Sequence, residues 1–184
     1  MPGLPLPTPP LEDAVVALRP WRETDVTAQL EAFSDPLFER FSDWAPRTHV
    51  DAIRYLVEQE AARLRGEQLE LALVNPGDMD VLLGGASLND VSLSQGRAAV
   101  GYWLVPEARG RGIATRAVRL LARWAFDSLG VARLELTCGP DNEASQRVAA
   151  RCGFTREGLL RSHTPFKGRR RDTVMFGLLP GELR

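Results

Sequence analysis

The chain has 184 residues and a formal net charge of −1, and 44% of its residues are hydrophobic and 26% charged. These values suit one globular domain, and the balanced charge argues against a nucleic-acid-binding protein that acts through overall electrostatic attraction. Two cysteines, Cys138 and Cys152, cannot form a disulfide framework or a four-thiolate metal site. We therefore expect free buried thiols, no metal, no nucleic-acid partner and a reduced, cytoplasmic setting.

The N-terminal residues 1–13 are rich in proline, which fixes φ and removes backbone donors. We predict a flexible tail there and a single domain over 14–184. No run approaches the ~20 apolar residues of a membrane span, and no basic region precedes an apolar stretch at the start. We therefore expect no secretory signal and no membrane partner.

The N-terminal half predicts one strand, two helices and an antiparallel pair. The strand covers 14–18, and Thr24 and Thr48 offer N-caps for helices that reach about residues 33 and 64. Asp35-Pro36 ends the first helix, and a loop follows. Apolar runs predict further strands at 69–74, 81–88 and 97–105, the first two joined by a turn at 75–78.

The C-terminal half begins with a crossover connection. A loop at 106–112 leads into a helix over 113–129, whose apolar residues recur every 3.6 positions and which Gly130 closes. A strand at 134–137 is predicted parallel to the strand before the helix, because a long crossover joins them. A helix at 143–151 and strands at 154–160 and 173–178 complete an α/β domain.

The loop before the long helix is a candidate phosphate site, because glycines admit a close ligand and a helix N-terminus favours negative charge. Its sequence is Arg109-Gly110-Arg111-Gly112-Ile113-Ala114-Thr115. No Gly-Lys-Ser/Thr follows, as a P-loop requires, and Thr115 stands where a dinucleotide-binding fingerprint needs a small residue. From the loop alone, a tight structural turn and a phosphate site are equal alternatives.

Three groups of motifs together resemble one family. Arg109-x-x-Gly112-x-Ala114 resembles the R/Q-x-x-G-x-G/A signature of the GCN5-related N-acetyltransferases, the GNAT superfamily. Asn142-Glu143-Ala144-Ser145 and the later Cys152-Gly153-Phe154 resemble its second cofactor-side segment. The RimJ/RimL-type branch is indicated by Leu18-Arg19-Pro20-Trp21, Gly101-Tyr102-Trp103-Leu104 and Gly168-Arg169-Arg170-Arg171-Asp172. Covering roughly 14–179, the resemblance implies the GNAT fold: a mixed, mostly antiparallel sheet of about seven strands, flanked by helices and splayed mid-sheet to hold acetyl-CoA.

The resemblance also implies how acetyl-CoA, the co-substrate, is held. The backbone of Leu104 and Val105 would pair with the pantetheine arm, and an N–H near Val105 would stabilise the oxyanion. Backbone N–H groups of 110–115 would hold the pyrophosphate, and Asn142 would hydrogen-bond the pantetheine, cap its own helix, or do both. The implied cofactor-binding residues are Leu104, Val105, Arg109, Gly110, Arg111, Gly112, Ile113, Ala114, Thr115, Asn142 and Ser145.

Direct attack of an amine on the thioester needs a base, an oxyanion donor and a proton for the thiolate. Ser145 resembles the thiolate-protonating serine of relatives, unless its hydroxyl bonds within its own helix. The acid that many relatives carry before the Gly-Tyr pair is here Ala99. Glu135 acting through water is one alternative base and His163 another, although a surface histidine suits the latter position better. Tyr102 is either a proton relay or strand packing.

The sequence shows no evident strong base, which favours an acceptor amine that is easily deprotonated. At pH 7, deprotonating a lysine amine costs about 4.6 kcal/mol, whereas an α-amine costs about 1 kcal/mol. The α-amine of a protein N-terminus or of a small molecule is therefore predicted over a lysine side chain. The RimJ/RimL resemblance implies a protein N-terminus, and relatives suggest a homodimer. The alternatives are an antibiotic, polyamine or amino acid as acceptor, or a catalytically weak acyl-CoA sensor.

Two further groups of residues have two interpretations each. The basic run 167–171 is a solvated turn or a partner contact. The aromatic residues either shape the acceptor pocket or pack the helices; they are Trp21, Phe38, Phe41 and Trp44.

Overall fold

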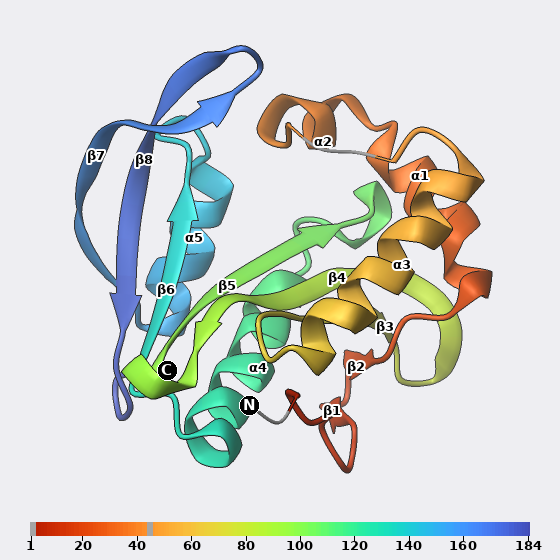
Figure 1. The fold of residues 1–184 in the computed structure, drawn as a ribbon, viewed down its shortest axis with the longest axis horizontal. Helices are drawn as coiled ribbons and strands as arrows, with labels where there is room; N and C mark the ends of the chain where they lie inside the picture. Colours follow the sequence, from red (N-terminus) through yellow and green to blue (C-terminus); the bar gives the residue numbers. More distant parts are fainter. Residues whose placement is uncertain (1–2, 44–45) are drawn as a thin grey trace.

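The structure is a computed structural model that describes residues 3–43 and 46–184. Its centre is one eight-stranded sheet in the order β1-β2-β3-β4-β5-β6-β8-β7 (Figure 1). The strands are β1 Leu11–Glu12, β2 Ala17–Arg19, β3 Leu69–Asn75, β4 Asp78–Ser92, β5 Arg97–Leu104, β6 Arg133–Cys138, β7 Thr155–Phe166 and β8 Arg169–Leu178. The helices are α1 Val26–Phe33, α2 Pro36–Phe41, α3 His49–Leu64, α4 Ile113–Leu129 and α5 Glu143–Cys152. Only β5 and β6 pair in parallel, which confirms the mixed, mostly antiparallel fold predicted from the sequence.

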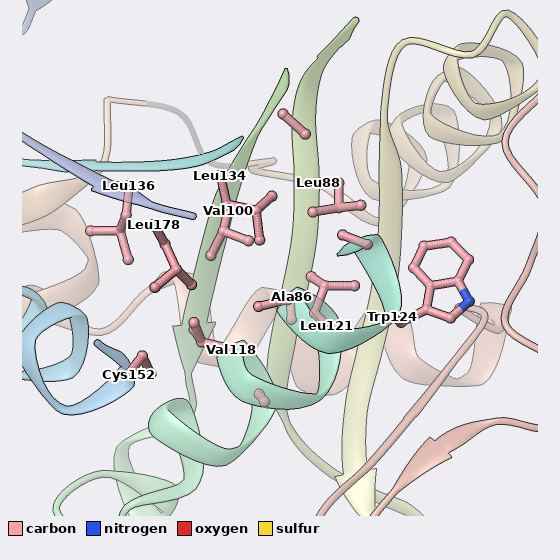
Figure 2. Packing of buried hydrophobic residues seen from close by; sticks show 14 of the residues in the cluster. Ala86, Leu88, Val100, Val118, Leu121, Trp124, Leu134, Leu136, Cys152 and Leu178 are labelled. Carbon is pink, nitrogen blue, oxygen red and sulfur yellow. The ribbon is translucent and has the colours of Figure 1, made fainter. Parts of the chain in front are cut away.

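Strand alternation gives the sheet two faces that pack against different helices. On one face, Val118 and Leu121 of α4 pack among Ala86 of β4 and Val100 of β5 (Figure 2). Burial of each such leucine or valine side chain contributes about 1.5–3 kcal/mol. The other face carries Ala72 and is covered by the N-terminal helices α1 and α3 (Figure 1).

The sheet opens between its two parallel strands. β5 and β6 are paired only from Arg97–Arg133 to Ala99–Glu135. Beyond Ala99 the two strands diverge, and Figure 1 shows the wedge that results. The splay predicted for the middle of the sheet is therefore present.

Several helix boundaries follow the local signals closely. α4 begins at Ile113 and ends at Leu129, and Gly130 closes it in the left-handed conformation with φ of 67°. The Thr48 side chain caps α3 by accepting a hydrogen bond from the Asp51 N–H at 3.1 Å. Such caps satisfy backbone groups that have no partner inside the helix.

The N-terminal region differs from the prediction in several places. Thr24 is not the N-cap of the first helix, because it lies in a 3-10 turn at Glu23–Asp25 and Asp25 is the N-cap residue of α1. Residues 36–41 form helix α2 instead of a loop, because Asp35 accepts a hydrogen bond from the Phe38 N–H at 3.0 Å and Pro36 suits the first helical position. The predicted tail carries Leu4, which is 1% exposed in the main core, and β1, which is the strand beyond the expected seven. Apolar side chains at 4 and 11 thus hold this proline-rich segment against the domain.

Cys138 and Cys152 are buried and free, as predicted. Within residues 3–43 and 46–184, no helix has the length and apolar character that a membrane crossing requires.

Candidate active site

A cavity of about 630 Å³ occupies the splayed part of the sheet. At one end it is lined by the loop before α4 and by α5, and at the other by α1, α2 and α3. It therefore connects the predicted cofactor segments with the region predicted to hold the acceptor.

The end of β5 directs backbone groups into this opening. The Val105 N–H donates to the Leu83 carbonyl at 3.0 Å, so it is engaged within the sheet. In an antiparallel ladder the next residue points its N–H and carbonyl the other way, so those of Leu104 face the gap toward β6. Arg109 donates to the Leu104 carbonyl at 3.1 and 3.3 Å. The structure thus favours Leu104, and not Val105 as expected, as the backbone donor at the gap.

The loop before α4 forms an open cradle at a helix N-terminus. Gly112 is the N-cap residue with φ of 77°, and a Cβ added there would meet no atom within 4 Å. No side chain of residues 3–43 or 46–184 caps this helix, so within that part of the chain the N–H groups of its first turn have neither intrahelical nor side-chain acceptors. The Thr115 hydroxyl is buried and has no hydrogen-bond partner among the described residues. Unpaired donors, open space and the positive end of the helix fit a diphosphate group.

Most of the predicted cofactor residues line the cavity. Those that do are Leu104, Arg109, Gly110, Gly112, Ile113, Ala114, Thr115, Asn142 and Ser145. Arg111 does not, because its exposed guanidinium reaches the Glu107 carbonyl at 3.5 Å. Arg147 and Arg151 of α5 also line it and supply positive charge, whereas Arg116 pairs with Asp13 at 2.8 Å.

Tyr102 and Ser145 come together in the middle of the cavity. The Tyr102 hydroxyl donates to Ser145 Oγ at 3.0 Å. Burial raises the pKa of Tyr102 to about 12, so this group remains a protonated donor at neutral pH. The Asn142 side chain caps α5 by accepting from the Ser145 N–H at 3.1 Å, and its amide group lines the cavity. Both roles considered for Asn142 are therefore geometrically compatible.

Two residues considered as bases lie elsewhere. Glu135 sits where β5 and β6 are still paired, and Arg133 holds its carboxylate at 2.9 Å and Arg97 at 3.9 Å. His163 lies on the exposed β7, where its carbonyl accepts from Arg170 at 2.6 Å. Neither is among the described residues that line the cavity.

Aromatic residues form the wall on the side of α1 and α2. Phe38 stacks on Phe33 with centroids 4.1 Å apart, and Phe33 meets Trp103 edge-on at 4.6 Å. Phe38 and Phe41 line the cavity, as the acceptor-pocket hypothesis expects. Trp21 stacks on Trp103 at 6.0 Å and packs the sheet instead. The remaining aromatic residue of that hypothesis, Trp44, lies outside the described residues.

The basic run 167–171 belongs to the turn and second strand of the β7–β8 hairpin. Lys167 and Gly168 form the turn, with φ of 49° and 74°. The Lys167 ammonium donates to the Glu39 carbonyl of α2, and the Arg171 guanidinium lies 3.9 Å from the Phe166 ring centroid. The hairpin thus meets α2 above the splay (Figure 1).

The sequence analysis missed two polar side chains that line the acceptor end. Glu70 on β3 accepts hydrogen bonds at Oε1 from Tyr55 at 3.3 Å and Gln68 at 3.0 Å. Burial raises the pKa of the Glu70 carboxyl to about 7. Gln29 of α1 is 1% exposed, and its Oε1 has no hydrogen-bond partner among the described residues. The sequence signal that could have indicated Glu70 is its position as the single acidic residue in the apolar run Leu-Glu-Leu-Ala-Leu-Val of 69–74.

Comparisons with known proteins agree with this geometry. A family model described as an acetyltransferase (GNAT) domain matches residues 16–155. The uncharacterized N-acetyltransferase p20 of Bacillus licheniformis is 30% identical over 168 residues, covering 91% of this chain and 94% of p20. The ribosomal-protein-serine acetyltransferase of Escherichia coli is 35% identical over 82 residues, 45% of this chain and 46% of that protein. The solved structure of Mycobacterium smegmatis RimJ in complex with CoA-disulfide superposes with a TM-score of 0.84 at 26% identity, covering 95% and 87% of the two chains.

Proposed function

The chain belongs to the GNAT acetyltransferase family, in its RimJ/RimL-type branch, and we propose that its acceptor is the α-amino group of a protein N-terminus. It is an acetyl-CoA-dependent N-acetyltransferase. The observation that carries the proposal is one continuous cavity. Its wall includes the N-terminus of α4, the hydroxyl pair of Tyr102 and Ser145, and a group of aromatic side chains with hydrogen-bond acceptors.

Acetyl-CoA binds at the α4 end of this cavity. The first-turn N–H groups of α4 and the Thr115 hydroxyl hold the pyrophosphate. The Leu104 N–H faces the thioester end of the bound cofactor, whereas the Leu104 carbonyl accepts from Arg109. Asn142 donates to the same arm with its amide N–H₂, because its carbonyl oxygen is engaged as the α5 cap.

Three groups of the chain act on the reacting atoms. The Leu104 N–H stabilises the negative charge that develops on the carbonyl oxygen of the thioester. Ser145 gives its proton to the departing thiolate, the Tyr102 hydroxyl orients Ser145 and replaces that proton, and water reprotonates Tyr102.

An α-amine suits this site better than a lysine side chain. Deprotonating an α-amine at pH 7 costs about 1 kcal/mol, against about 4.6 kcal/mol for lysine. The cavity walls present no aspartate, histidine or lysine among the described residues, which leaves one weakly acidic carboxyl to take the proton. A relative named as a ribosomal-protein-serine acetyltransferase, from Escherichia coli, supports a protein acceptor.

The test is release of free thiol from acetyl-CoA with N-terminal peptides, the same peptides blocked at the N-terminus, lysine peptides, and small amines including a polyamine. We expect kcat/KM for free N-terminal peptides to exceed that for lysine peptides by at least about 100-fold, and blocked peptides to be inert. A preference for a small amine would reassign the acceptor. Tight acetyl-CoA binding without turnover would indicate a sensor, and absence of acetyl-CoA binding would overturn the mapped cofactor site.

A further inference from the structure

Glu70 is the only carboxyl group among the described residues that line the cavity. It lies opposite Ser87 in β4, and Ser87 lies opposite Gly101 in β5. Residues directly opposite one another in antiparallel strands share a face of the sheet. Glu70 therefore points to the face that α1 and α3 cover, beside the part of β5 that borders the splay.

The hydrogen bonds of Glu70 leave one carboxylate oxygen to the cavity. In the described structure, two side chains donate hydrogen bonds to Glu70: Tyr55 of α3 and Gln68, which directly precedes β3. Both donate to Oε1, and neither donates to Oε2. On α1, the buried Gln29 Oε1 has no partner in the described part of the chain, and Gln29 lines the same cavity as Glu70. Two hydrogen-bond acceptors in an apolar, aromatic pocket match a group that carries several N–H donors, as an amine does.

We propose that Glu70 is the general base of the reaction and that Gln29 orients the acceptor amine beside it. This inference rests on the proposed acetyltransferase function. Glu70 Oε2 takes a proton from the acceptor ammonium while Gln29 Oε1 accepts a second N–H. The neutral nitrogen then forms the C–N bond as the C–S bond breaks. Of the two protons that leave nitrogen, one balances the proton gained by the thiolate sulfur, and Glu70 passes the other to water.

The ionisation of Glu70 agrees with this role. With a pKa of about 7, the carboxyl is about half ionised at neutral pH. Proton transfer to it from an α-ammonium is unfavourable by less than about tenfold, whereas transfer from a lysine ammonium is unfavourable by more than about a thousandfold. The base therefore selects the same acceptor class as the proposed function.

Among the described residues, Tyr55 is the ionisable side chain that contacts Glu70. Glu70 is bonded by Tyr55 from α3 and by Gln68, which directly precedes β3; it lies opposite Ser87 of β4 and shares the cavity with Gln29 of α1. Burial and the neighbouring Glu70 raise the pKa of Tyr55 above its usual value, so it stays protonated. The cationic side chains elsewhere on the cavity wall are Arg109, Arg147 and Arg151.

The test compares Glu70→Gln with Glu157→Gln, a matched control on the exposed β7 outside the cavity. With an N-terminal peptide near pH 7, we expect kcat of Glu70→Gln to fall by about 100-fold or more, because general-base catalysis contributes about 10²–10⁴-fold. The acetyl-CoA Kd should stay within about twofold, and the defect should shrink near pH 9, where the amine is already neutral. A kcat within about threefold of wild type, or a defect equal at both pH values, would overturn the inference.

Tyr55→Phe provides a second test that keeps the carboxyl. Loss of the Tyr55 hydrogen bond removes an interaction that lowers the pKa of Glu70. The ascending limb of the kcat–pH profile should therefore move to higher pH, and an unmoved limb contradicts the assignment even if Glu70→Gln does not fold. If wild-type protein itself turns over no amine, the proposed function fails. If wild type is active and both variants match it, only the role of Glu70 fails.

Discussion

The partly buried carboxyl of Glu70 leads to a prediction about stability that does not depend on activity. Its pKa is raised from 4.5 to about 7 by burial, so the folded state resists its ionisation. The associated stability is fully present below pH 4.5, is lost as pH rises through about 7, and changes no further above that. Glutamine has no charge at any pH, so Glu70→Gln removes this loss.

The magnitude follows from the difference between the two pKa values. One pKa unit corresponds to 1.36 kcal/mol, so the upper limit is about 3 kcal/mol, and relaxation or water entry reduces it to about 2 kcal/mol. We expect Glu70→Gln to match wild type in free energy of unfolding near pH 4 and to exceed it by about 2 kcal/mol near pH 8. Urea denaturation at a series of pH values measures both.

Glu157→Gln is the control with the opposite sign. Arg133 donates to the Glu157 carboxylate at 2.6 and 2.8 Å and holds its pKa below the usual value. That carboxylate contributes stability above pH 4.5 which is lost as pH falls. A Glu70→Gln difference that is constant with pH, or that follows the direction of Glu157→Gln, would refute the argument that burial dominates at Glu70.

Three further predictions concern the ion pair below α1, the hydroxyl at the thiolate and the glycine of the cradle. Asp25→Ala should destabilise the protein by about 3–5 kcal/mol in urea denaturation, because it leaves the buried Arg19 guanidinium without the carboxylate that it meets at 2.8 Å. Ser145→Ala should lower kcat by about 10- to 100-fold with little change in acetyl-CoA Kd, as expected for loss of one hydrogen bond to a developing charge. Gly112→Ala should raise the acetyl-CoA Kd at least about tenfold in calorimetry. The control Gly130→Ala has a similar positive φ at the other end of α4, and should cost about 1 kcal/mol of stability without affecting binding.

The sequence predicts the half of the site whose signals are local. Gly112 and Gly130 bound α4, and the crossover between 105 and 134 requires a parallel pair, so the cradle and the splay follow from short stretches. The Tyr102–Ser145 contact was predictable only through the family resemblance, because 43 residues separate its partners. Nothing local to either residue indicates that they meet.

The elements missed by the sequence analysis depend on distant partners. Asp35-Pro36 ends one helix and begins the next. The same two residues are also compatible with a loop after the first helix, so the local sequence does not decide whether α2 forms. Leu4 joins the core because its backbone pairs with Arg63, at the far end of α3. From its neighbours in the sequence, Glu70 is an ordinary polar residue on a strand. Its role depends on α1 and α3, which cover it in the folded structure. The acceptor end of the site is thus a product of tertiary packing.

The two groups that we propose to transfer protons lie on opposite faces of the sheet. Tyr102 lies opposite Ala86 of the core and meets Ser145 of α5, whereas Glu70 shares a face with Ser87 and is covered by α1 and α3. In a continuous sheet the strands would separate them. Because β5 and β6 stop pairing after Ala99, the opening lets a thioester held from one face meet an amine held from the other. Because the pKa of Tyr102 is about 12 and that of Glu70 about 7, the proton donor proposed for sulfur does not neutralise the base proposed for nitrogen, so one cavity can hold both.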